Sequence, residues 1–214
     1  PWNAVVLESA RRIEALRRAL GDNADIAVDL GARLSEPVRA GQLIHALAPF
    51  QPMFIGEPLG PGHIPSLRRL REQADAPLAT GRSLNGVGQY ADLIDAQATD
   101  VVQPDLTRCG GIMEAKKIAA VAEANYVTVA PYNPLGLLST AVSLHFAAST
   151  PNFAIMEYPG DHARPGARFV DDPWKPVDGY LPLPTRTGLG MELDQDAIAK
   201  SPPSPWRTKV RMGV

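Results

Sequence analysis

The sequence alternates short apolar runs with amphipathic segments, and this alternation constrains the fold more than any other feature. The amphipathic segments carry apolar residues at helical spacing, and most of the apolar runs end at a polar residue or a glycine. Predicted strands cover residues 26–28, 53–55, 77–80, 101–103, 128–130 and 153–156. Predicted helices cover residues 4–20, 38–47, 64–73, 86–96, 112–124 and 137–149. Short apolar strands joined by helical crossovers predict an α/β protein with a parallel sheet covered by helices.

A (β/α) barrel and a doubly wound sheet both satisfy this pattern. The strand ends recur about every 25 residues, at Asp29, Gly56, Gly81, Asp105, Tyr132 and Glu157. No glycine-rich phosphate loop follows the first predicted strand, which disfavours a dinucleotide-binding sheet. The even period therefore favours an incomplete (β/α) TIM-type barrel, with about six of the eight βα units visible.

The chain is expected to divide into a barrel and a tail. Residues 1–160 form the predicted barrel, from the helix of its second unit to its last strand. Residues 161–214 form a tail rich in Pro and Gly that packs on the barrel. Because an open parallel edge exposes unpaired backbone groups, we expect a preceding segment, another chain or a homo-oligomer to complete the barrel.

Composition and charge argue against several classes of partner. A net charge of -2 and a pI near 6.1 give no broad basic field, so nucleic acid is not an expected partner. No apolar run approaches the roughly 18 to 20 residues that span a bilayer, so no membrane partner is expected. Cys109 is the only cysteine, which excludes an internal disulfide and a thiolate metal cluster and fits a reducing cytoplasm.

Polar side chains at the predicted strand ends indicate a site. In (β/α) barrels these positions meet at one mouth. We therefore expect one pocket to contain Asp29, Arg82, Asp105, Tyr132 and Glu157. Any one of them alone could be a loop cap, an ion-pair partner or a cover for the core. Five polar side chains at one structural period favour a shared pocket that binds a small molecule.

Several blocks resemble the signature blocks of the galactonate dehydratase and mandelate racemase group of the enolase superfamily. They are FIGEP at 54–58, QPDL at 103–106, GGI at 110–112, APYNPLG at 130–136 and GLG at 188–190. The resemblance covers nearly the whole chain and implies the C-terminal barrel of that superfamily, with an N-terminal capping domain outside this sequence. It also implies a carbon–oxygen lyase acting on sugar acids, or a racemase. In that family three strand-end carboxylates hold Mg²⁺, which polarises the substrate carboxylate so that a base removes the α-proton.

Three residues match the functional positions of the family. Asp29 matches the first Mg²⁺ ligand, and Asp105 matches the aspartate that orients the catalytic histidine. Glu157 matches the acid on the last strand that hydrogen-bonds the substrate or enolate. The resemblance thus implies catalytic roles for Asp105 and Glu157 and leaves Asp29 as one metal ligand.

Other functional positions of the family are replaced. The second and third ligand positions are Gly56 and Arg82, and the acid/base histidine is Tyr132. Glu57 follows a ligand position, but successive strand side chains face opposite ways, so it should point into the wall. The lysine bases that other members carry on the second strand would precede Pro1. Ordinary α-proton abstraction is therefore expected to be very slow or absent.

The charge change at Arg82 predicts a different way of binding an acid. At about 4 Å, two like charges repel by roughly 4 kcal/mol at an effective dielectric of 20, so a guanidinium opposes a cation there. We expect Arg82 to pair with Asp29 and to offer a bidentate fork to a carboxylate, with Tyr132 as a hydrogen-bond donor. No cofactor is then expected, and Mg²⁺ is the alternative that the resemblance implies.

Three functions are compatible with these residues. The first is a protein without ordinary dehydratase activity that binds a small carboxylate or sugar acid, or acts as a subunit. The second is an active lyase or isomerase on a hydroxy acid that works without a metal, because barrel mouths accept new chemistry. The third is a structural partner that completes its barrel with another chain.

Overall fold

The computed structural model describes residues 1–60, 62–134 and 136–201. Five short strands form one parallel sheet in chain order. They are β1 (Ala27–Asp29), β2 (Phe54–Gly56), β3 (Leu78–Thr80), β4 (Val101–Val102) and β5 (Thr128–Val129). Asp29 pairs with Gly56 in the register, so the last residues of β1 and β2 are level. The predicted parallel α/β fold is confirmed.

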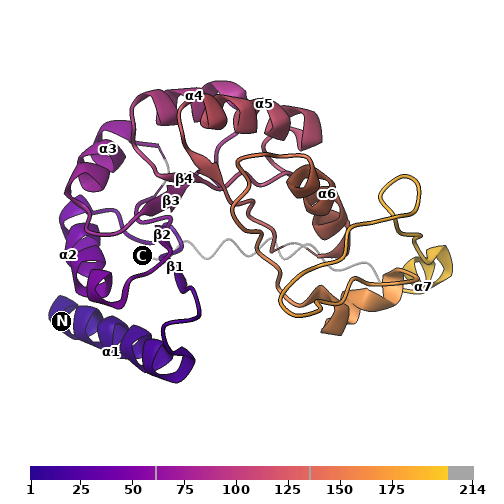
Figure 1. Ribbon diagram of the computed structural model, residues 1–214, viewed down its shortest axis with the longest axis horizontal. Helices are drawn as coiled ribbons and strands as arrows, with labels where there is room; N and C mark the ends of the chain where they lie inside the picture. Colours follow the sequence, from indigo (N-terminus) through magenta and orange to yellow (C-terminus); the bar gives the residue numbers. More distant parts are fainter. Residues whose placement is uncertain (61, 135, 202–214) are drawn as a thin grey trace.

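Helices precede β1 and follow each strand. They are α1 (Trp2–Leu20), α2 (Pro37–Leu47), α3 (Ile64–Gln73), α4 (Gly86–Asp95), α5 (Gly111–Ala124) and α6 (Leu137–Ala148), and the short helix η1 (Ala48–Phe50) follows α2. Figure 1 shows α2 to α5 as an arc around the outer side of the strands. These elements agree with the predicted ones to within two residues at each end, as expected where apolar periodicity is strong.

The sixth predicted strand, residues 153–156, is not a regular strand. Phe153 makes a single parallel bridge to Val129, flanked by hydrogen bonds of 2.9 Å from Val129 N to Asn152 O and from Ala154 N to Val129 O. Across the described ranges, no strand pairs with the outer edge of this segment, and Ile155 is 44% exposed. One bridge is too short a ladder to count residues 153–156 as a regular strand. The residues that the structure describes form an incomplete (β/α) barrel, with no strand among them between β1 and this segment.

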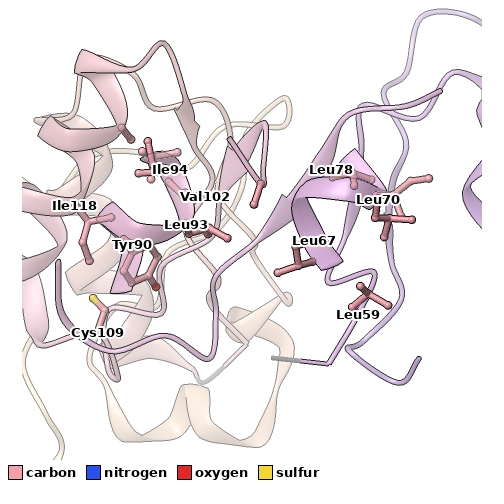
Figure 2. Packing of buried hydrophobic residues seen from close by; sticks show 14 of the residues in the cluster. Leu59, Leu67, Leu70, Leu78, Tyr90, Leu93, Ile94, Val102, Cys109 and Ile118 are labelled. Carbon is pink, nitrogen blue, oxygen red and sulfur yellow. The ribbon is translucent and has the colours of Figure 1, made fainter. Parts of the chain in front are cut away.

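The core lies between the sheet and the helices. Figure 2 shows Tyr90, Leu93 and Ile118 packed together, with the Cys109 thiol beside Tyr90. Tyr90 is fully buried, and its hydroxyl donates to Gly81 O at 2.7 Å. Burial raises the pKa of Cys109 to about 11, which keeps this sulfur a protonated packing atom rather than a nucleophile.

Helix α1 lies at one end of the arc and contains no fully buried residue. Trp2 and Ile13 pack against the core, whereas four large side chains stay about half exposed: Val5, Leu7, Leu16 and Leu20. Within the described part of the chain, no helix has both the length and the apolarity to cross a bilayer.

The tail packs against α6. It contains η2 (Asp161–Ala163), η3 (Pro165–Phe169) and α7 (Gln195–Ala199). Trp174 is 8% exposed and packs with Ala141 and Leu144 of α6. The Tyr158 hydroxyl donates to Trp174 O at 2.7 Å, which ties the tail to the segment that follows the last bridge. Residues 202–214 of the predicted tail lie outside the described residues, and the boundary after residue 160 remains a prediction.

Candidate functional site

A cavity of about 250 Å³ extends from the first residues of β1 and β2 to the carboxyl ends of the strands. Its polar lining consists of Asp29, Arg82, Gln103, Tyr132 and Glu157, and its apolar lining includes Ala27, Phe54 and Ala130. Four of the five predicted strand-end residues therefore share one cavity. A larger cavity of about 510 Å³ lies between the start of α6 and the tail, but its lining is mostly apolar and includes none of these residues.

Arg82 and Asp29 form an ion pair at the mouth. Arg82 Nη1 donates to Asp29 Oδ2 at 2.8 Å, and the two side chains are 18% and 56% exposed. The guanidinium carbon lies 4.9 Å from the centre of the Tyr132 ring, a distance typical of a cation–π contact. Desolvation opposes the charge on Arg82, but attraction to Asp29 and their hydrogen bond outweigh it, so the pKa of Arg82 is raised. This cation is therefore permanent.

Glu57 points into the wall, as its place after Gly56 predicts. Its side chain is 1% exposed, and its backbone φ is +45°. Oε1 accepts hydrogen bonds from Gly81 N at 2.8 Å, Arg82 N at 3.1 Å and Thr80 Oγ1 at 3.3 Å. A carboxylate with these partners cannot serve as a metal ligand at the mouth.

Gly56 leaves a space that a neighbouring amide partly fills. A Cβ placed on Gly56 would lie 3.2 Å from Gln103 Oε1, so the Gln103 side chain reaches the position of the second family ligand. Gln103 lines the cavity but is not among the predicted site residues, although it ends the predicted strand at 101–103. The strand-end rule that selected the other residues would have included it.

The residues at the three family ligand positions do not fit a magnesium ion. They supply one carboxylate at Asp29, no side chain at Gly56 and a guanidinium at Arg82. No group of three His, Cys, Asp or Glu residues in the described ranges is arranged to hold a metal. These three residues do not suit Mg²⁺ because Asp29, the only carboxylate among them, is already bonded to the Arg82 cation.

Tyr132 and Glu157 both line the cavity. Desolvation raises the pKa of Tyr132 although the positive charge of Arg82 opposes this, so the phenol is neutral at physiological pH. Desolvation also raises the pKa of Glu157, against a weak hydrogen bond of 3.4 Å from Asn133 N. Tyr132 can donate a hydrogen bond, but its high pKa makes it a poor base.

Asp105 is the exception among the predicted residues, because it does not line the cavity. The expected convergence of all five side chains is wrong at this position. Asp105 is buried, and its Oδ1 accepts from Thr107 N at 2.9 Å and from Thr107 Oγ1 at 2.6 Å. The Asp105 carboxylate therefore caps the loop after β4 instead of lining the cavity. The orienting role that the resemblance gives Asp105 remains a prediction.

Comparison with known proteins places these observations in a family. Residues 3–197 match the sequence model described as Enolase C-terminal domain-like. The D-galactonate dehydratases of Xanthomonas oryzae pv. oryzae (strain PXO99A) and Ralstonia nicotianae are 33% and 34% identical to this chain, over 96% of it. The chain spans 57% of the length of each of these relatives.

Solved structures give the same grouping. An enolase from Agrobacterium radiobacter with bound Na and L-malate is 42% identical, with a TM-score of 0.87 over 93% of this chain and 54% of that one. A mandelate racemase/muconate lactonizing enzyme from Jannaschia sp. CCS1 is 32% identical, with a TM-score of 0.82 over 91% of this chain and 49% of that one.

Proposed function

This chain belongs to the Enolase C-terminal domain-like family, and from that premise we propose that its strand-end cavity binds a small carboxylate through Arg82 instead of a divalent cation. The observation that carries the proposal is the ion pair between Arg82 and Asp29. The resemblance assigns the position of Arg82 to a metal ligand. The alternative, which the family implies, is that the site binds Mg²⁺.

The donor arrangement of Arg82 suits a carboxylate. Nη1 is bonded to Asp29, and within the described ranges no protein acceptor engages Nε or Nη2. The guanidinium carbon also lies 4.9 Å from the centre of the Tyr132 ring. A planar guanidinium edge binds carboxylate oxygens in a bidentate manner, and such charge-assisted bonds are roughly twice as strong as neutral ones.

The same residues do not support ordinary sugar-acid dehydration. Tyr132 replaces the acid/base histidine, and its raised pKa leaves it protonated where a base is needed. Asp105 Oδ1 accepts hydrogen bonds from the amide and the hydroxyl of Thr107. We therefore propose that the protein turns over aldonic acids very slowly or not at all. Glu157 is the remaining acid of the lining, and its catalytic role is part of the alternative in which the site carries out metal-independent lyase or isomerase chemistry.

The volume of the cavity within the described residues suits a small acid. A cavity of about 250 Å³ is close to the lower end of ordinary ligand sites. L-malate, which is bound in the Agrobacterium radiobacter enolase, is a suitable first probe, and D-galactonate is the second. Apolar Ala27, Phe54 and Ala130 would contact the carbon chain of the acid.

Calorimetric titration of the full-length protein tests this proposal. L-malate and D-galactonate are titrated in EDTA and again with Mg²⁺. We expect at least one acid to bind in EDTA with an affinity that Mg²⁺ does not change, and Arg82→Ala to weaken it about tenfold or more. Arg186→Ala is the matched control, because Arg186 pairs with Asp171 in the tail. Binding only with Mg²⁺, or Mg²⁺-dependent dehydration of D-galactonate, would contradict the proposal.

A second role as a structural partner is favoured by the open edge of the arc. The only ladder of β1 is with β2, and α1 has no fully buried residue, among the residues described. We propose that strands from a preceding segment or a second chain pair with β1. The Ala27 and Asp29 amides alternate with those that face β2. Their hydrogen exchange in the full-length protein should then be slow, and fast exchange would argue against a partner strand.

A further inference from the structure

We propose that Glu57 is a positioning residue that holds the Arg82 guanidinium over the cavity. Its effect on ligand affinity rests on the proposed carboxylate binding, but its effect on Arg82 does not. Glu57 is 1% exposed, lies outside the cavity lining, and uses one carboxylate oxygen to accept both successive amides of Gly81 and Arg82.

The backbone of Glu57 is fixed on two sides. Glu57 N donates to Ala79 O at 2.8 Å, and Glu57 O accepts from Ala32 N at 3.0 Å. These bonds join the end of β2 to β3 on one side and to the loop after β1 on the other. Because Asp29 ends β1 and Arg82 follows β3, Glu57 connects the two segments that carry the ion pair.

The carboxylate sets the path of the chain at Arg82. Gly81 has φ +123°, a conformation that L side chains rarely adopt, and its amide and the next one both point at Glu57 Oε1. Loss of that oxygen would leave two amide donors in a poorly hydrated place without an acceptor, and such groups are costly to leave unpaired. The turn would then relax, and the Arg82 side chain would leave its place over Tyr132.

The phenol of Tyr132 reports on Arg82 without any ligand. The Arg82 charge, 4.9 Å from the ring centre, lowers the pKa of Tyr132 against the larger effect of desolvation. Displacement of the guanidinium should therefore raise that pKa. The titration is followed by NMR of the tyrosine ring carbons in the full-length protein, with Tyr132→Phe used to assign the signal.

Three variants separate positioning from general damage. Glu57→Ala removes the acceptor, Glu57→Asp shortens it, and Glu57→Gln keeps an acceptor oxygen at the same reach. We expect the Ala variant to raise the Tyr132 pKa and to weaken L-malate binding about tenfold, and the Asp variant to change both in the same direction. Glu57→Gln should largely preserve both. Glu114→Ala is the control, because Glu114 also accepts a backbone amide, from Val87, but lies away from the cavity.

The two readouts distinguish the two proposals. An unchanged Tyr132 pKa in the Asp variant, or in a folded Ala variant, would overturn the positioning role whatever happens to L-malate. A wild-type protein that binds neither acid, but whose Tyr132 pKa rises on Glu57→Asp, would overturn the proposed function and support the positioning role.

Discussion

Arg82 Nη1 donates to Asp29 Oδ2 at 2.8 Å, which joins the loop after β3 to the end of β1 across the intervening strand β2. The strand between them ends at Gly56, which carries no side chain. The absence of a side chain at Gly56 and the cation at Arg82 are thus related. The guanidinium neutralises the only acid among the three residues that the resemblance assigns to metal-ligand positions, and we propose that it provides a positive charge in place of the metal.

Restoring the acids should restore a divalent site. We expect Gly56→Glu combined with Arg82→Glu to bind Mg²⁺ at least about tenfold more tightly than the wild type, because three carboxylates would then converge. The Cβ at position 56 would lie 3.2 Å from the flexible end of Gln103, which can move aside. Calorimetry measures the affinity. The single Gly56→Glu variant is the control, since its new acid would pair with Arg82. Equal Mg²⁺ affinity in the double variant and the wild type would count against the account.

The turn that leads to Arg82 should tolerate no side chain at Gly81. A Cβ there would lie 2.9 Å from Cε1 of Tyr90, which is fully buried, and φ is already +123°. Gly62 is the matched control, because its φ is +113° but nothing lies within 4 Å of its Cβ position. We expect Gly81→Ala to lower the free energy of unfolding by about 1–3 kcal/mol more than Gly62→Ala does. Urea denaturation measures both, and equal losses would show that packing against Tyr90 is unimportant.

Glu157 should make stability depend on pH. Desolvation raises its pKa in the folded protein, so the folded state retains a proton that the unfolded chain has lost. Stability associated with this group is therefore present below its ordinary pKa and is lost as the pH rises through the raised value. We expect Glu157→Gln to remove this loss, so that the variant gains stability relative to the wild type as the pH rises from about 4, the ordinary pKa of a glutamic acid, through the raised value. A constant difference across that range in thermal unfolding would refute the prediction.

Much of the fold could be predicted because it depends on local pattern. The period of the strand ends identifies the barrel and places Asp29, Arg82, Tyr132 and Glu157 at one mouth. The alternation of side chains along a strand turns Glu57 away from that mouth. Both arguments need only chain geometry, which is why the structure agrees with them.

The remaining features depend on partners that periodicity cannot identify. The apolar run at residues 153–156 looks like the others, but within the described chain it makes only a single bridge, from Phe153 to Val129. Asp105 ends a strand segment like the others, but the hydroxyl and amide of Thr107 attract its carboxylate. Predicting that Glu57 accepts these amides requires the path of the loop after β3, which is a long-range property of the fold.

A direct test of the central claim is an anomalous diffraction measurement at the Mn²⁺ edge, on crystals of the full-length protein soaked with Mn²⁺ and L-malate. The account predicts no anomalous peak within about 2.0–2.5 Å of the Asp29 carboxylate, and an L-malate carboxylate within hydrogen-bond distance of Arg82. A manganese ion coordinated by Asp29, with Arg82 swung away from it, would contradict the claim that a guanidinium has replaced the metal.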